Sequence, residues 1–236
     1  MRDAIVFNGA SNLDFQEIRA NVIRIPEVVL RIREAQEIWD KISTMSLDLA
    51  NFIASEDSVF LSHIKLKSFA TAVVQVGLLD RYLKSHRLAE FMIGMVNGDS
   101  PLQVALGKMT FYDMVAKSSA LPSASNKIQN VSNALDLPVL AGVQLAEFGV
   151  FRRNEESGEF ERMKIETREV ERMIVDLIDG FEVRKLVMVG PGNSVCGKKV
   201  MDFTARDVQV LESIDQDPML SWFWTKLKEN RLAIAN

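Results

Sequence analysis

The sequence predicts an α/β protein in which a mainly parallel sheet is flanked by helices. Short apolar runs alternate along the chain with longer segments of helical period, a pattern typical of a parallel sheet covered by helices. Two of these runs, at 4–7 and 185–189, lead directly into glycine-containing turns, as buried strands often do. This alternation of strand and helix patterns continues through most of the chain.

The composition favours one soluble domain spanning 1–236. The chain has 236 residues, of which 47% are hydrophobic and 25% charged, which is ordinary for a globular protein. Its net charge of -4 and pI near 5.4 give no basic excess with which to bind nucleic acid or an anionic membrane. The start "MRDAIVFNGA" matches neither a signal peptide nor a membrane span. We therefore expect a cytoplasmic protein with no nucleic-acid or membrane partner.

The chain has one cysteine, Cys196, and two histidines, His63 and His86. One cysteine cannot form an internal disulfide framework, and three such residues are too few for an ordinary structural zinc site. We predict no metal site and no cofactor.

The N-terminal half contains two helical segments between two strand candidates. After Pro26, a favourable residue for the first turn of a helix, residues 27–42 place apolar side chains near one helical face. Residues 66–83 are more apolar and rich in small side chains, as expected of a helix buried against the sheet. We expect the strands at 4–7 and 91–93.

The C-terminal half begins with a polar connection near 118–127, rich in Ser, Asn and Pro. The other elements predicted here are a helical segment at 127–135, a strand at 137–143, a hairpin near 149–165, a helix at 168–179 capped by Thr167 and ended by Gly180, a strand at 185–189 and a helix that starts at Asp217.

Residues 91–115, "FMIGMVNGDSPLQVALGKMTFYDMV", predict a strand, a tight turn and a helix. Gly94 and Gly98 have the spacing of a nucleophile elbow, G-x-S-x-G, whose middle residue stands at the head of a sheet. The middle residue here is Val96, which has no nucleophilic atom. The motif predicts a catalytic turn that lacks its nucleophile.

This stretch resembles malonyl-CoA:acyl carrier protein transacylases and the acyltransferase domains of polyketide synthases, which have roughly GHSLGEYAALVAAGALSFEDAL at residues 94–115. Three further segments are similar in the same order: "AIVFNGASN" resembles FVFPGQGSQ, "ATAVVQVGLL" resembles AxFAVQVAL, and "LVMVGPGNSVCGKKV" resembles FVEIGPGNVLSGLVK. The matched segments cover most of the chain. The resemblance implies the fold of the large, hydrolase-like subdomain of these enzymes.

The resemblance also implies that the catalytic positions are vacant. Val96 stands where the family has its nucleophilic Ser, and Met95 where it has the neighbouring His. Ala10 replaces the oxyanion Gln, a kind of loss that usually costs on the order of a hundredfold in rate. Leu121 falls at the carboxylate-binding Arg, and no histidine follows His86 to act as the base. We predict no catalytic residues.

The family inserts a small ferredoxin-like subdomain after the elbow helix, and this chain has no room for it. The polar connection near 118–127 is of ordinary loop length rather than subdomain length. We expect the small subdomain to be missing.

Other candidate sites have simpler explanations. "GPGNSVCGKK" fits G-x-x-x-x-G-K from Gly192 to Lys198, but Lys199 replaces the magnesium-binding hydroxyl, so a structural strand-to-helix turn is the favoured interpretation. Cys196 is interpreted as a small buried hydrophobe and the two histidines as parts of solvated faces. Of the consecutive aromatics near the C-terminus, Trp222 and Trp224 are candidates for a partner contact, because not all can face one side of a helix.

The sequence therefore predicts a catalytically silent acyltransferase-like protein with a binding, scaffold or regulatory role. The resemblance implies an acyl carrier protein or another enzyme of fatty-acid or polyketide synthesis as partner, and a homodimer is also considered. A vestigial pocket is expected at Asn8, Gly9, Val96 and Asn97. Two alternatives stay open: an active transferase or hydrolase that uses Ser100 or Cys196, and a sensor that binds CoA thioesters without chemistry.

Overall fold

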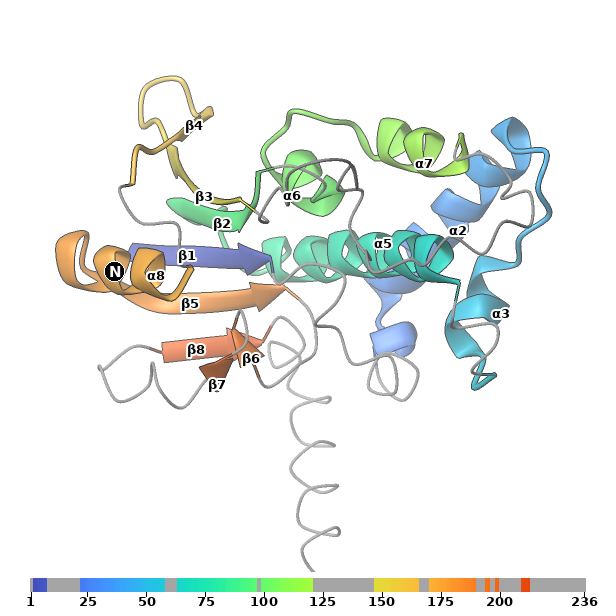
Figure 1. The fold of residues 1–236 in the computed structure, drawn as a ribbon, viewed down its shortest axis with the longest axis horizontal. Helices are drawn as coiled ribbons and strands as arrows, with labels where there is room; N and C mark the ends of the chain where they lie inside the picture. The colour runs from blue at the N-terminus through green and yellow to red at the C-terminus, as the bar shows by residue number, and fades with distance from the viewer. Residues whose placement is uncertain are drawn as a thin grey trace, which may run out of the picture.

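The computed structural model describes residues 2–7, 22–57, 63–96, 99–120, 147–165, 170–189, 194–195, 198–199 and 209–212. Within these residues the chain forms a six-stranded sheet flanked by helices (Figure 1). The predicted α/β class is therefore confirmed.

The sheet is mixed, with strand order β4-β3-β2-β1-β5-β8. Its strands are β1 (Arg2–Phe7), β2 (Phe91–Met95), β3 (Phe148–Arg153), β4 (Phe160–Arg162), β5 (Val183–Val189) and β8 (Gln209–Glu212). The neighbouring strands β2, β1, β5 and β8 run parallel to one another. The strands β3 and β4 are antiparallel additions at one edge of the sheet. The parallel part matches the expectation from the alternating pattern.

The central strands are buried on both faces, which explains why their sequences are continuous apolar runs rather than alternating ones. In β1, Ile5 and Phe7 belong to one hydrophobic core, and Ala4 and Val6 belong to a second. Successive side chains of a strand point to opposite faces, so the two cores lie on opposite sides of the sheet.

The two faces are covered unequally. The helix α8 (Val170–Gly180) supplies the helical part of the core on one face. The larger core, on the other face, contains residues from the other helices, among which α2 packs on both α5 and α7 (Figure 1). These helices are α2 (Pro26–Ile42), α3 (Leu49–Ala54), α5 (Ile64–Leu83), α6 (Ser100–Ala105) and α7 (Phe111–Ser119), preceded by the short 3-10 helix η2 (Val22–Arg24).

The long helix α5 runs antiparallel to the parallel strands. Near its middle, Gln75 Nε2 donates to the carbonyl of Val189, the last residue of β5, over 3.2 Å. Near its end, the Tyr82 hydroxyl lies 3.5 Å from Asp3 at the start of β1. Its N-terminal half therefore extends beyond the ends of the strands (Figure 1).

Most elements predicted within the described residues are present. Pro26 lies at the start of α2 as expected, and the helix predicted at 66–83 is α5. The hairpin predicted near 149–165 is formed by β3 and β4, and its turn includes Gly158 with φ of 74°. The helix ended by Gly180 and the strand at 185–189 are also confirmed.

Two expectations are corrected. The single helix after the elbow is two helices, because Gly107, with φ of 70°, follows the end of α6 and a Thr110–Asp113 capping box starts α7. The segment "GPGNSVCGKK" does not form a strand-to-helix turn: β6 (Ser194–Val195) pairs antiparallel with β7 (Lys198–Lys199). A phosphate-binding loop needs its Lys at the start of a helix, which this pairing does not provide.

The elements predicted at 127–135, at 137–143 and from Asp217, together with Thr167, Trp222 and Trp224, lie outside the described residues. Within the part of the chain that the structure describes, no helix is both long and apolar enough to cross a membrane.

Candidate functional site at the end of β2

Ligands of open α/β sheets bind beyond the carboxyl ends of the parallel strands. At this edge β1 ends at Phe7, which pairs with Val189 of β5, and β2 ends at Met95. Of the site residues predicted from the sequence, Met95 and Val96 lie in the described part of the chain. Asn8, Gly9, Ala10, Asn97 and Leu121 lie outside it.

The backbone of Val96 continues the pairing of β2 with β3. Its N–H donates to the Glu147 carbonyl over 2.8 Å, next to the last paired residues Met95 and Phe148. Apart from glycines, the only described residue with positive φ is Glu182. A nucleophile elbow is a sharp, strained turn, and such strain is commonly stored as an unfavourable φ/ψ combination. Val96 does not have a positive φ.

The side chain of Val96 lies against β3. A Cβ atom built on Gly149 would meet Val96 Cγ2 at 2.8 Å, so Gly149 leaves the room that this side chain occupies. Val96 is half-buried and also packs on the larger hydrophobic core. A valine in this position fills space and offers no group for acyl transfer.

Gly94 allows α6 to lie directly on β2. A Cβ atom there would come within 2.9 Å of Leu102 Cδ2 and 3.0 Å of Asp99 Oδ2. Both of these side chains come from the start of α6, and both are buried. The first elbow glycine therefore has a packing role in this chain.

Asp99 is a buried polar group at the end of β2, where its Oδ2 lies beside Gly94. It is the N-cap of α6: Oδ1 accepts from the Leu102 N–H over 3.1 Å. Only 4% of the residue is exposed, and among the described residues no group makes a hydrogen bond of normal geometry to Oδ2. Burial raises the pKa of Asp99 to about 6, against the smaller lowering effect of the Leu102 and Met95 backbone amides.

Two more buried polar side chains lie on α5, one helical turn apart. Gln75 is 1% exposed and donates a hydrogen bond to the last residue of β5, and Thr71 is fully buried with no hydrogen-bond partner for its hydroxyl among the described residues. Asp99, Gln75 and Thr71 were not predicted from the sequence. The Asp-Ser-Pro sequence at 99–101 is a helix-start signal that could have identified the cap, but nothing local indicates that it is buried.

Neither His86 nor His63 is recorded in contact with Val96 or Asp99 in the part of the chain that the structure describes. The His86 ring stacks on Tyr82 at 4.4 Å, and Tyr82 reaches Asp3 at the opposite end of the strands. His63 is exposed at the start of α5. Ser100 is half-buried in the first turn of α6, and Cys196 lies outside the described residues. Among the residues that the structure describes, no group of three or more His, Cys, Asp or Glu could hold a metal ion.

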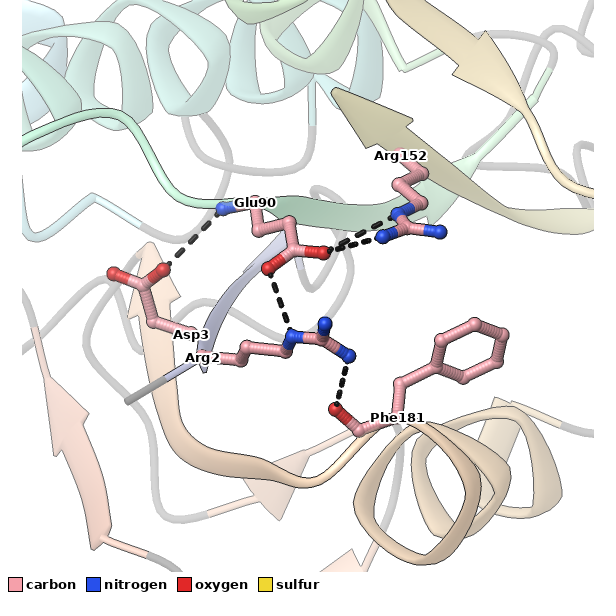
Figure 2. A network of polar contacts seen from close by, with 5 residues as sticks. All are labelled: Arg2, Asp3, Glu90, Arg152 and Phe181. Carbon is pink, nitrogen blue, oxygen red and sulfur yellow. Dashed lines mark hydrogen bonds and ion pairs between the residues drawn. The ribbon is translucent and has the colours of Figure 1, made fainter. Parts of the chain in front are cut away.

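At the opposite ends of the parallel strands, where β1 and β2 begin, a network of ion pairs is centred on Glu90 (Figure 2). Glu90 Oε1 accepts from Nε and Nη2 of Arg152 over 3.2 and 3.0 Å, and Oε2 pairs with Arg2 Nε at 3.3 Å. The Glu90 N–H donates to Asp3 Oδ1 over 3.3 Å. These contacts connect the starts of β1 and β2 with β3.

Two arginines cap the end of α8, and one of them, Arg2, belongs to the network. Arg2 Nη1 donates to the Phe181 carbonyl over 3.1 Å, and Arg184 Nη1 donates to the Ile178 carbonyl over 2.9 Å. Cationic side chains at the C-terminal end of a helix satisfy its free carbonyls and complement its dipole. The network thus has a complete structural explanation, and the candidate site is the edge formed by Val96, Gly94 and Asp99.

Comparisons of the chain with protein-family models, with curated proteins and with solved structures found no match.

Proposed function

We propose that this protein is a catalytically silent, acyltransferase-like protein that acts by binding. The observation that carries the proposal is the environment of Val96: a hydrocarbon side chain packed beside Gly149, on a backbone whose N–H is bonded to Glu147. Acyl transfer needs a nucleophile, a base and an orienting group in contact with one another. Of the two histidines, His86 stacks at the other edge of the sheet and His63 is exposed.

The proposed binding role rests on the resemblance to transacylases. Such a body would dock an acyl carrier protein or another enzyme of fatty-acid or polyketide synthesis. Its net charge of -4 would repel an acidic partner at long range, so a contact with such a partner would depend on local complementarity. A homodimer and a CoA-thioester sensor are the alternative binding roles.

Incubating the purified chain with malonyl-CoA or acetyl-CoA, followed by intact-mass measurement, tests catalytic silence. We expect no increase in mass and no thioester hydrolysis above the rate without protein. The alternative nucleophiles are tested in the same assay with Ser100→Ala and Cys196→Ala. A covalent acyl adduct, or turnover that either substitution abolishes, would contradict the proposal.

Thermal unfolding in the presence of the same CoA thioesters distinguishes the binding roles. A ligand that binds only the folded state at a hundred times its Kd stabilises it by about 2.7 kcal/mol. A raised melting temperature without an adduct would favour the sensor. An unchanged melting temperature with CoA thioesters, together with a complex formed with acyl carrier protein, would favour the docking role.

A further inference from the structure

The cap at the start of α6 is unusual because the capping carboxylate is buried. A carboxylate N-cap normally keeps its second oxygen in water, as Asp48 does on α3. Asp99 makes the same capping bond but is 4% exposed, and its Oδ2 lies over Gly94. A Cβ atom built on Gly94 would meet Leu102 Cδ2, Asp99 Oδ2 and Phe7 Cβ within 3.3 Å, so two of the three atoms around this position are apolar.

We propose that Asp99 is a proton-operated latch between β2 and α6: the neutral carboxyl group holds the start of α6 on Gly94, and the ionised group lets this contact open more readily. The reason is the cost of a buried charge, which is far greater than that of a neutral carboxyl group and which backbone amides alone offset only in part. Opening would return Oδ2 to water and remove this cost.

Among the residues that the structure describes, no charged side chain compensates for ionisation of Asp99. The helix α6 packs on β2, α5 and α7, and neither α6 nor β2 contains an ionisable side chain. The ionisable side chains on the other two helices are Lys65, Lys67, Asp80, Arg81 and Tyr82 on α5, and Tyr112, Asp113 and Lys117 on α7. Within the described residues, the influences that favour the ionised form of Asp99 are the backbone amides of Leu102 and Met95.

The direction of the pH effect follows from linkage. Asp99 has a raised pKa of about 6 in the folded protein and an ordinary value of 3.8 when exposed. Between these values the closed form holds more protons than the open one, so the closed form loses stability as pH rises. The closed form is therefore most favoured below the ordinary pKa of 3.8, loses stability as pH rises toward the folded pKa of about 6, and changes little above that value.

Hydrogen exchange of the native protein, read on peptides that cover 95–106 and corrected for the intrinsic pH dependence of exchange, tests the latch. We expect the opening equilibrium of α6 to increase about tenfold between about pH 5 and about pH 8. Asp99→Asn keeps a good capping side chain but cannot ionise, so this variant should lose the increase. Asp48→Asn on the exposed cap of α3 is the matched control and should leave the increase unchanged.

A carbon-detected NMR titration of the wild-type Asp99 carboxyl provides a second measurement that does not depend on any variant. A pKa above about 5 supports the latch, since exposed Asp titrates near 3.9. A pKa near 3.9 would overturn it. Exchange at 95–106 that keeps its pH dependence in Asp99→Asn would overturn it as well.

Discussion

Replacing Gly77 with alanine is expected to destabilise the protein by about 1–3 kcal/mol, because the new methyl group would overpack the crossing of α2 and α5. A Cβ atom at Gly77 would lie 2.7 Å from Val28 Cα and 3.0 Å from Val28 Cγ2. The nearer atom belongs to the backbone of α2, so the clash cannot be relieved by rotating a side chain. The two helices must move apart, and the core between them must loosen.

Chemical denaturation measures this effect, with Gly180→Ala as the matched control. Gly180 ends α8, and a Cβ atom there would meet nothing within 4 Å. The control is expected to change the unfolding free energy by less than about 1 kcal/mol. If Gly77→Ala were as stable as Gly180→Ala, the described contact between α2 and α5 would be wrong.

Replacing Arg81 and Lys84, the two cationic side chains next to Glu27, is expected to lower the free energy of unfolding by about 3–5 kcal/mol, because the buried Glu27 charge would be left unpaired. The Glu27 side chain is 3% exposed in the first turn of α2. Lys84 Nζ lies 2.5 Å from Oε1, without ideal hydrogen-bond direction, and Arg81 Nη1 lies 3.6 Å from it. The test variant is Arg81→Met with Lys84→Met, measured by denaturation.

Adding Glu27→Gln to that double variant provides the control. Both variants lack every other contact of Arg81 and Lys84. The difference between their unfolding free energies therefore measures the cost of leaving the Glu27 carboxylate buried without a cation. We expect the triple variant to recover most of the lost stability. If the triple variant were no more stable than the double variant, the buried charge would not be the cause of the loss.

The pH dependence at Glu27 has the opposite sign to that at Asp99. Burial acts to raise the pKa of Glu27, but the contact with Lys84, the Glu27 backbone amide and the charges of Arg81 and Lys84 together outweigh it, so the pKa lies below 4.5. The stabilisation is therefore present above the unfolded pKa and is lost as pH falls through the folded one. The stability difference between wild type and Glu27→Gln should shrink in acid.

The sequence predicted those elements whose signal is local. The apolar run of β1, the Pro26 start of α2 and the charged turn between β3 and β4 are all properties of neighbouring residues. The separation of α6 from α7 also had a local signal, since Thr110 and Asp113 form a capping box. The prediction of one helix after the turn missed this capping box.

The features that were missed depend on contacts between distant parts of the chain. Gln75 bonds to Val189, 114 positions away, and Gly77 has its role only because α2 crosses there. The burial of Asp99 likewise results from the packing of α6 on β2. The pairing of β6 with β7 overrode a motif that is normally followed by a helix. Such effects have no periodicity that a single sequence can display.

Reaction of Val96→Ser with a fluorophosphonate probe is the most direct test of the central claim that this edge has no catalytic machinery. The probe labels serines that a neighbouring base activates. Val96→Ser should fold, as checked by circular dichroism, and should gain neither probe labelling nor malonyl transfer, while an active serine hydrolase is labelled in parallel. Labelling that maps to residue 96 would show that a base and oxyanion donors are in place there, and it would contradict the account.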